Sequence, residues 1–254
     1  MELPPNRLKA ALAAGGSPQW GMFTSLADPV AAEICAGAGF HFVVIDTEHA
    51  PADLRTVLTQ LQAMSAYPVE PVVRTYSDDP AVIKRFLDLG VRTVLVPMVA
   101  SGEQAAAVVR SVCYAGDGIR GVSTARAARW GRVADYHATA DAQIAVIVQV
   151  ESAAGLDHLD EICTVDGVDA VFIGPMDLAT SLGYVAGGTH PDVVAIVDDA
   201  LRRIVANGCA AGVLAATPEL VQRYVAAGAT FVAAGVDTAL LARATSALRD
   251  SLTS

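Results

Sequence analysis

The chain has 254 residues, of which 53% are hydrophobic and 17% are charged, and its formal net charge is −10. A strongly acidic surface disfavours binding to nucleic acids and to anionic membranes, because both partners are negatively charged. No run of about 18 apolar residues is present, so no membrane span is expected. The length suits one (β/α)8 barrel or two smaller domains.

The mean hydropathy of +0.44 is high for a soluble protein. Strands of a parallel barrel are covered on both faces, and contacts between subunits bury further apolar surface. We therefore expect a homo-oligomer. The cysteines are widely spaced and lack a CxxC pair, so free buried thiols in a reducing cytoplasm are expected. They are Cys35, Cys113, Cys163 and Cys209.

Eight short apolar segments are predicted to be β-strands, and a short helix is predicted before the first of them. Amphipathic helices are predicted between most strands, because apolar residues recur there every three or four positions. The predicted strands lie at about residues 19–23, 41–46, 70–74, 93–98, 144–150, 169–173, 210–214 and 230–234. The clearest helical patterns cover Pro29 to Ala38, Asp53 to Met64, Pro80 to Leu89 and Gly102 to Cys113.

This repeated alternation of strand and helix predicts one (β/α)8 barrel domain over residues 1–254. An open, doubly wound sheet is the alternative architecture. That fold usually carries a glycine fingerprint between its first strand and first helix. Here Gly37 and Gly39 come before a strand, where they are expected to end a helix.

Polar side chains follow several of the apolar strands directly. Because the carboxyl ends of barrel strands meet at one face, these side chains are expected to form one active site. They are Asp46, Glu48 and His49 after the second strand, Arg74 at the third, Gln149 and Glu151 at the fifth, and Asp177 after the sixth.

Glu151 and Asp177 follow neighbouring strands and are candidate metal ligands. Adjacent strands lie about 5 Å apart, so both carboxylates can reach one cation. Two carboxylates that leave other positions to water and substrate suit Mg²⁺ or Mn²⁺. The alternative is that each acid caps the helix that follows it.

His49 is a candidate general base, since the pKa of histidine lies near working pH, and its alternative is a solvated turn residue. Arg74 is a candidate for stabilising an oxyanion or binding a carboxylate, and its alternative is a salt bridge at the rim. The long glycine-containing segment at residues 114–130 carries three arginines, among them Arg120. It is interpreted as a substrate lid on the active face, the alternative being a plain surface loop.

Seven motifs together resemble those of the HpcH/HpaI-type class II pyruvate aldolases, such as 4-hydroxy-2-oxo-heptane-1,7-dioate aldolase. The likeness extends from about Trp20 to Leu248, nearly the whole chain. The motifs are Asp46–Pro51, Pro71–Arg74, Leu95–Val99, Gly118–Val122, Val148–Glu151, Phe172–Leu178 and Val232–Asp237.

This resemblance implies a role for each matching residue. Glu151 and Asp177 would bind the metal, and His49 would be the base. The residues alone would instead pair His49 with Asp46, and that pairing stays open. The family commonly has alanine at the position of Met176, which leaves the substrate range open. The other implied roles are Asp88 raising the basicity of His49, Arg74 stabilising the enolate, and Gln149, Gly174, Pro175, Met176 and Asp177 binding the 2-oxo acid.

The implied reaction is reversible aldol cleavage of a 4-hydroxy-2-oxo acid to pyruvate or hydroxypyruvate and an aldehyde. The implied cofactor is a divalent cation, Mg²⁺ or Mn²⁺, with Co²⁺ or Zn²⁺ as further options, and the implied assembly is a hexamer. Neither Lys9 nor Lys84, the only lysines, stands where a Schiff base would form. The alternatives are a lyase acting on a CoA thioester, as in citrate lyase β subunits, and a non-catalytic barrel that binds small anions.

Overall fold

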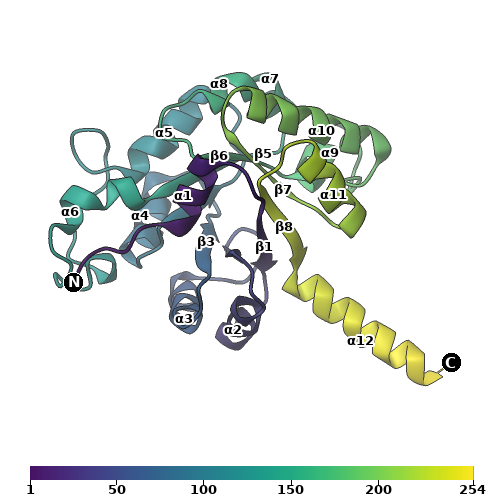
Figure 1. Cartoon of the computed structure of the whole chain (residues 1–254), viewed down its shortest axis with the longest axis horizontal. Coiled ribbons are helices and arrows are strands. Elements are labelled where there is room, and N and C mark those ends of the chain that lie inside the picture. The colour runs from purple at the N-terminus through teal and green to yellow at the C-terminus, as the bar shows by residue number, and fades with distance from the viewer. Residues whose placement is uncertain (254) are drawn as a thin grey trace.

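Eight parallel strands form a closed barrel in the computed structural model, which describes residues 1–253. Each strand pairs with the next in the chain, and the last pairs with the first (Figure 1). The predicted (β/α)8 barrel is therefore confirmed. The largest differences from the predicted bounds are at the fourth strand, which ends at Val96, and the eighth, which continues to Val236. The strands are β1 (Gln19–Thr24), β2 (Phe42–Asp46), β3 (Glu70–Arg74), β4 (Thr93–Val96), β5 (Ala145–Val150), β6 (Ala170–Ile173), β7 (Ala210–Leu214) and β8 (Phe231–Val236).

Helices connect the strands, and local residues set where several of them begin and end. Asp28 accepts hydrogen bonds from the backbone N–H groups of Val30 and Ala31, and Pro29 occupies the first turn. Gly90 has a φ of 92°, a left-handed conformation that ends its helix before β4. The helices after the strands are α2 (Pro29–Gly37), α3 (Leu54–Met64), α4 (Pro80–Asp88), α5 (Gly102–Val112), α7 (Ala153–Asp157), α8 (Leu159–Cys163), α9 (Pro175–Ser181), α10 (Pro191–Ala206), α11 (Pro218–Ala226) and α12 (Asp237–Thr253).

The barrel interior is filled with side chains. The rings of Phe42 and Phe231 stack there, with centroids 4.1 Å apart. Gly21 of β1 has no room for a side chain, because the Phe42 ring occupies the place where its Cβ would lie. The N-terminal end of the barrel is closed by α1 (Arg7–Ala14), whose Leu8 and Leu12 belong to the interior cluster. A ligand can therefore enter the barrel itself only at the carboxyl ends of the strands.

A larger apolar layer packs between the strands and the helices. The four cysteines are free thiols, as expected, although only Cys35 and Cys163 are buried, and Cys113 and Cys209 are partly exposed. Within residues 1–253, no helix is both long and apolar enough to cross a bilayer.

The long segment between α5 and β5 lies at the N-terminal end of the barrel, beside the start of the chain and far from the active face (Figure 1). It contains η1 (Arg126–Ala128), α6 (Tyr136–Thr139) and η2 (Asp141–Gln143). The backbone N–H of Ala134 donates to the carbonyl of Met1. The expectation that this segment covers its own active site is therefore wrong. The physical reason is that a connection from a helix to the next strand ends where that strand begins.

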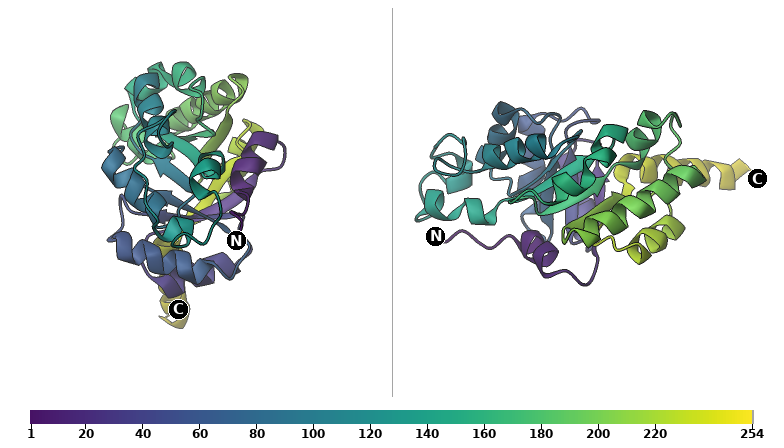
Figure 2. Two further views of the ribbon diagram at one scale, coloured as in Figure 1. Left: turned by 90° about the vertical axis from the view of Figure 1, so that its left-hand side faces the viewer. Right: turned by 90° about the horizontal axis from the view of Figure 1, so that it is seen from above.

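The last helix, α12, projects away from the barrel instead of packing against it (Figures 1 and 2). Residues 239–252 are exposed. Ala234 of β8 is exposed as well, although Val232 on the same strand is buried, so the outer face of β8 is left uncovered only toward its carboxyl end.

Candidate active site

A cavity of about 220 Å³ opens at the carboxyl ends of the strands. Most strands supply part of its wall, and its polar side chains come from β2, β3, β5 and the start of α9. The polar residues lining it include Asp46, His49, Arg74, Gln149 and Asp177, and Met176 lines it as well. The barrel thus brings together the residues that the sequence placed after separate strands.

Arg74 is held rigidly by Asp46. Arg74 Nε donates to Asp46 Oδ1 at 2.9 Å, and Nη2 donates to Oδ2 at 2.8 Å. The guanidinium also lies over the ring of Phe23, 5.0 Å from its centroid. Burial raises the pKa of Asp46, but the hydrogen bonds and charge of Arg74 outweigh this, so the net pKa is lowered. The rim salt bridge considered for Arg74 is thus a buried, two-point ion pair that aims a fixed cation at the cavity.

Glu48 is a third partner in this network; it was expected at the active face, but no specific role was predicted for it. Its Oε2 lies 3.3 Å from Arg74 Nη1 and 3.8 Å from His49 Nε2. This oxygen is buried and accepts no hydrogen bond from residues 1–253. Burial raises the pKa of Glu48, and nearby Asp46 and Asp177 add to the effect. Its position directly before His49, at the end of the β2 run, was the signal that could have identified it.

His49 lies at the rim of the cavity, and 59% of its side chain is exposed. Asp46 does not pair with its imidazole. Instead, Asp46 Oδ1 accepts a hydrogen bond from the backbone N–H of His49 at 3.3 Å. The imidazole faces Glu48, so Glu48 is the acid that can orient this ring within one chain.

Asp88 and Arg120 do not join this site within one chain. Asp88 ends α4 at the N-terminal end of the barrel, where its carboxylate is 4.0 Å from Arg120 Nη2. Arg120 is buried there against Tyr114, its guanidinium 4.5 Å from the ring centroid. Both residues therefore lie at the opposite end of the barrel from His49.

Glu151 is buried behind the cavity wall, with only 2% of its surface exposed. Its Oε1 accepts a hydrogen bond from the backbone N–H of Met98 at 2.8 Å, and its Oε2 accepts one from the Gln149 amide. Met98 has a φ of 57°, a left-handed conformation uncommon for a residue with a side chain. Burial raises the pKa of Glu151 to about 7, and the charges of Glu48 and Asp177 add to the effect.

Helix capping does not explain the two acids. Ser152, not Glu151, caps α7 and accepts a hydrogen bond from Gly155 N–H. Asp177 lies in the first turn of α9, whose N-cap is Gly174, and no side chain caps that helix. A Cβ at Gly174 would lie 2.5 Å from Glu151 Oε2, so glycine here lets the β6 end approach Glu151 closely.

The donor set of Glu151 and Asp177 fits a hard divalent cation. Burial raises the pKa of Glu151, and the negative charge of Asp177 raises it further, so a cation between the two acids would stabilise both carboxylates. Gln149 Oε1 is buried beside them without a hydrogen-bond donor among residues 1–253. Within that range no three His, Cys, Asp or Glu side chains form a ligand set, so water and substrate would complete the coordination.

A family model described as HpcH/HpaI aldolase/citrate lyase matches residues 19–244. The chain belongs to this family. It is 56% identical, over 99% of its length and 92% of the relative's, to a hydroxypyruvate/pyruvate aldolase of Deinococcus radiodurans. It is 49% identical, over 96% and 93%, to a 4-hydroxy-2-oxo-heptane-1,7-dioate aldolase of Escherichia coli.

Among solved structures, the chain is similar to an HpcH/HpaI aldolase/citrate lyase family protein from Burkholderia cenocepacia. The TM-score is 0.94 at 41% sequence identity, and the match covers 98% of this chain and 100% of the other. The resemblance found in the motifs is thereby confirmed at the level of the family and of the fold.

Proposed function

We propose that this protein catalyses the reversible, metal-dependent aldol cleavage of a 4-hydroxy-2-oxo acid to pyruvate or hydroxypyruvate and an aldehyde. The observation that carries the proposal is the acid pair at one small cavity: Asp177 lines it together with the fixed guanidinium of Arg74, and Glu151, whose pKa is raised to about 7, is buried behind its wall. The two relatives named aldolases, each about half identical to the chain, support the reaction type.

Glu151 and Asp177 would hold the divalent cation, and their all-oxygen donor set favours Mg²⁺ or Mn²⁺ over Zn²⁺, with Co²⁺ also compatible. When bound, the ion supplies Lewis-acid stabilisation of negative charge on the keto oxygen. The Gln149 amide and the first turn of α9, from Gly174 to Asp177, would bind the 2-oxo acid. Backbone N–H groups in a first helical turn lack intrahelical partners and suit a carboxylate.

Arg74 would stabilise the enolate. Cleavage begins when a base removes the proton from the C4 hydroxyl of the substrate. The C3–C4 bond then breaks, the aldehyde leaves, and the electron pair becomes an enolate whose oxygen carries the negative charge. A cation already fixed by Asp46 needs no rearrangement to meet that charge, which is the property of an effective oxyanion site. Protonation of C3 completes the formation of pyruvate.

His49 would be the base, with Glu48 as its positioning residue. The ring lies at the cavity rim, where an incoming hydroxyl group can reach it, and Glu48 Oε2 is 3.8 Å from Nε2. The same carboxylate faces Arg74 at 3.3 Å, so one side chain connects base and cation.

The lysines support chemistry without a Schiff base. Lys9 pairs with Asp169 at 2.7 Å on the N-terminal side of the barrel, and Lys84 lies in α4 outside it. Neither reaches the cavity, which excludes a covalent intermediate on lysine. A CoA phosphate would need basic side chains near the active site. The arginines of the segment at residues 114–130 lie at the far end of the barrel, so no observation favours the CoA-thioester lyase.

A homo-oligomer is part of the proposal, and α12 supports it. Leu241, Leu248 and Leu252 are exposed and recur at helical spacing on this projecting helix. On α2, which follows β1, Val30 and Ile34 are exposed as well. A second copy would cover these surfaces by placing its α12 against α2 and the exposed carboxyl end of β8, at Ala234.

Leu248→Glu should therefore shift the protein to a smaller species in light scattering coupled to size-exclusion chromatography, because it puts a charge into the proposed contact. Ser246→Glu, on the other side of α12, is the control and should leave the mass unchanged. An unchanged mass for Leu248→Glu would contradict the proposed role of α12. Asp88 can act on His49 only across a subunit boundary, so the expected hexamer is also the condition for its implied role.

The activity is tested by incubating the chain with 4-hydroxy-2-oxo acids and following pyruvate with lactate dehydrogenase and NADH. Turnover with added Mg²⁺ or Mn²⁺, lost in EDTA and restored by the metal, is the expected result. Full activity after rigorous chelation would overturn the metal proposal. No pyruvate from any such acid would instead favour the non-catalytic anion-binding barrel.

A further inference from the structure

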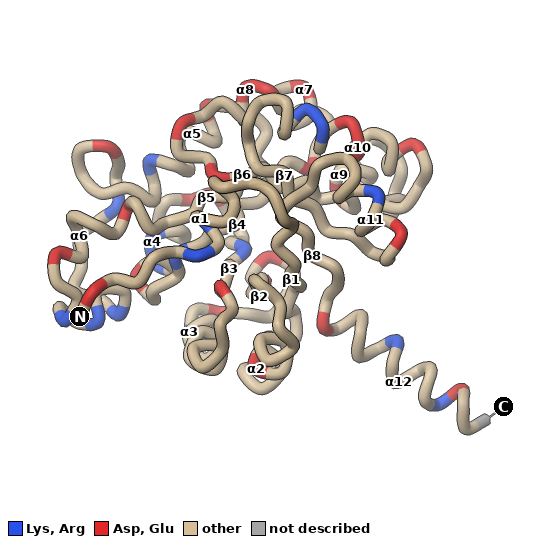
Figure 3. The backbone as a smooth tube through the Cα atoms, in the orientation of Figure 1, with Lys and Arg blue, Asp and Glu red and all other residues tan. Residues whose placement is uncertain are grey.

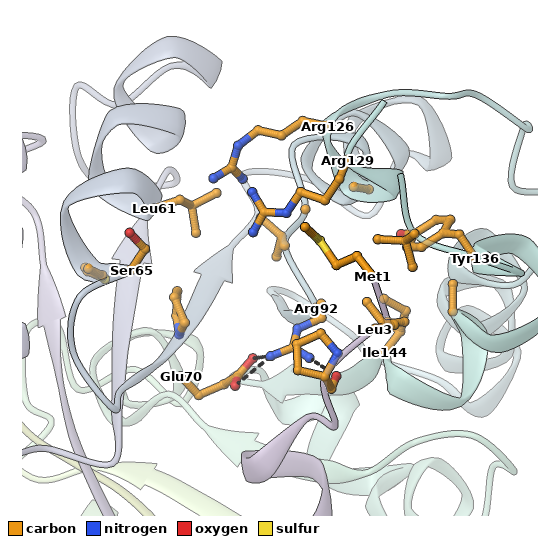
Figure 4. A pocket seen from close by; sticks show the side chains of 18 of the residues that line it. Met1, Leu3, Leu61, Ser65, Glu70, Arg92, Arg126, Arg129, Tyr136 and Ile144 are labelled. Carbon is orange, nitrogen blue, oxygen red and sulfur yellow. Dashed lines mark hydrogen bonds and ion pairs between the residues drawn. The ribbon is translucent and has the colours of Figure 1, made fainter. Parts of the chain in front are cut away.

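A second cavity, of about 460 Å³, lies at the N-terminal end of the barrel. It is bounded by α3, by the first residues of the chain and by the segment between α5 and β5 (Figure 4). Much of its wall is apolar and includes Leu61, Val91 and Ile144. At this volume it lies within the range of small-molecule sites and exceeds the active-site cavity.

Three arginines line this cavity, and only one of them is paired. Arg92 forms an ion pair with Glu70 at 3.2 Å. Within residues 1–253, neither Arg126 nor Arg129 is within salt-bridge distance of an acid, although the exposed Glu2 also lines the cavity. Arg126 uses Nη1 to donate to the Leu89 carbonyl, which leaves its other nitrogens free to bind a ligand.

The two unpaired guanidiniums lie close together, as Figure 4 shows. Arg129 has a φ of 48°, and its neighbour Trp130 has a φ of 54°, so the backbone here is in the left-handed region. Such strained conformations cluster at ligand sites. Burial, together with the charge of Arg129, lowers the pKa of Arg126. The chain has a net charge of −10, so a local excess of positive charge contrasts with the rest of the molecule. Figure 3 shows these basic positions beside the N-terminus.

We propose that this cavity is a second ligand site, for an organic carboxylate with an apolar body. The carboxylate would lie between Arg126 and Arg129, whose planar guanidiniums can each donate two parallel hydrogen bonds to it. The apolar body would lie against Leu61, Val91 and Ile144. The side chains inside the barrel separate this cavity from the active site of the same chain, so the ligand here is distinct from the substrate that this chain cleaves.

The test uses 4-(trifluoromethyl)benzoate as the probe and follows it by ¹⁹F NMR titration of the full chain. Arg126→Gln/Arg129→Gln should weaken binding at least tenfold, since both charge partners of the carboxylate are lost. Arg110→Gln/Arg202→Gln makes the same change in net charge at exposed positions outside the cavity and should shift the affinity less than twofold. The uncharged 4-(trifluoromethyl)benzamide should bind the natural chain at least tenfold more weakly than the benzoate.

Arg126→Lys/Arg129→Lys distinguishes the loss of the two charges from misfolding caused by substitution at these positions. It keeps both charges and should retain binding within about fivefold. Equal affinities for the two glutamine variants, equal affinities for benzoate and benzamide, or no binding to the natural chain would each overturn the proposal. The measurement does not use turnover, so its outcome is independent of the aldolase assignment.

Discussion

The two ends of the barrel both hold unpaired charge, but of opposite sign and on different supports. At the carboxyl end, the acids Glu48, Glu151 and Asp177 outnumber the single guanidinium of Arg74, and strand ends or the first helical turn after a strand carry each group. At the amino end, Arg126 and Arg129 form no ion pair with an acid among residues 1–253, and a long connection carries them. Strand ends hold groups at fixed separations, as catalysis requires, whereas a connection forms a site only when its own packing orders it.

The largest effect is expected from removing the cation at the carboxyl end. Arg74→Ala should lower kcat by about 10³ or more, because the enolate loses its fixed counter-charge. It should also reduce the free energy of unfolding by roughly 3–5 kcal/mol, since Asp46 is left buried and unpaired. Steady-state kinetics and urea denaturation measure both. A rise in KM at unchanged kcat would make Arg74 a binding group only.

Removing the imidazole should have a comparable or smaller effect. His49→Ala should lower kcat by about 10²–10⁴, the usual size of general acid–base catalysis. Glu48→Gln should shift the pH profile of kcat/KM while leaving a larger residual rate, because it removes only the group that faces the ring. A His49→Ala rate near that of the natural protein would remove this residue from the mechanism.

Glu151 should make the free energy of unfolding depend on pH when EDTA removes divalent cations. The raised pKa of Glu151 means that the folded state keeps this proton to higher pH than the unfolded state does. Stability should therefore fall as pH rises from about 4.5 to about 7, by about 3 kcal/mol, and then level off. Glu151→Gln should flatten this slope in urea denaturation at pH 5 and 8. Glu103→Gln, at an exposed acid, is the control, and an equal slope in Glu151→Gln would contradict the assignment.

The smallest effect tests whether the two ends are independent. Arg126→Gln/Arg129→Gln should change kcat and KM less than threefold in the absence of any added carboxylate, because neither side chain approaches the active-site cavity of its own chain. A loss comparable to that of His49→Ala would show that the ends are coupled through the assembly.

Much of the active site could be predicted, because the apolar pattern of a strand and the polar residue that follows it can both be read from a short stretch of sequence. Several apolar runs end in a polar group, and a parallel barrel brings such ends together whatever the details of packing. No specific role was predicted for Glu48, because its significance depends on its distance to Arg74, which lies on a different strand, β3. The lid interpretation failed because residues 114–130 follow a helix and precede a strand, and barrel closure places such a segment at the other end.

The sequence by itself determined the eight strands, the family, and the polar residues that follow β2, β3, β5 and β6, because short-range periodicity and motif spacing encode them. Only the tertiary structure decided that Asp46 belongs to Arg74, that Asp88 and Arg120 lie away from His49, and that α12 leaves the barrel. These contacts form only when the sheet closes into a barrel. They join residues that are far apart in the chain, so local sequence patterns do not encode them.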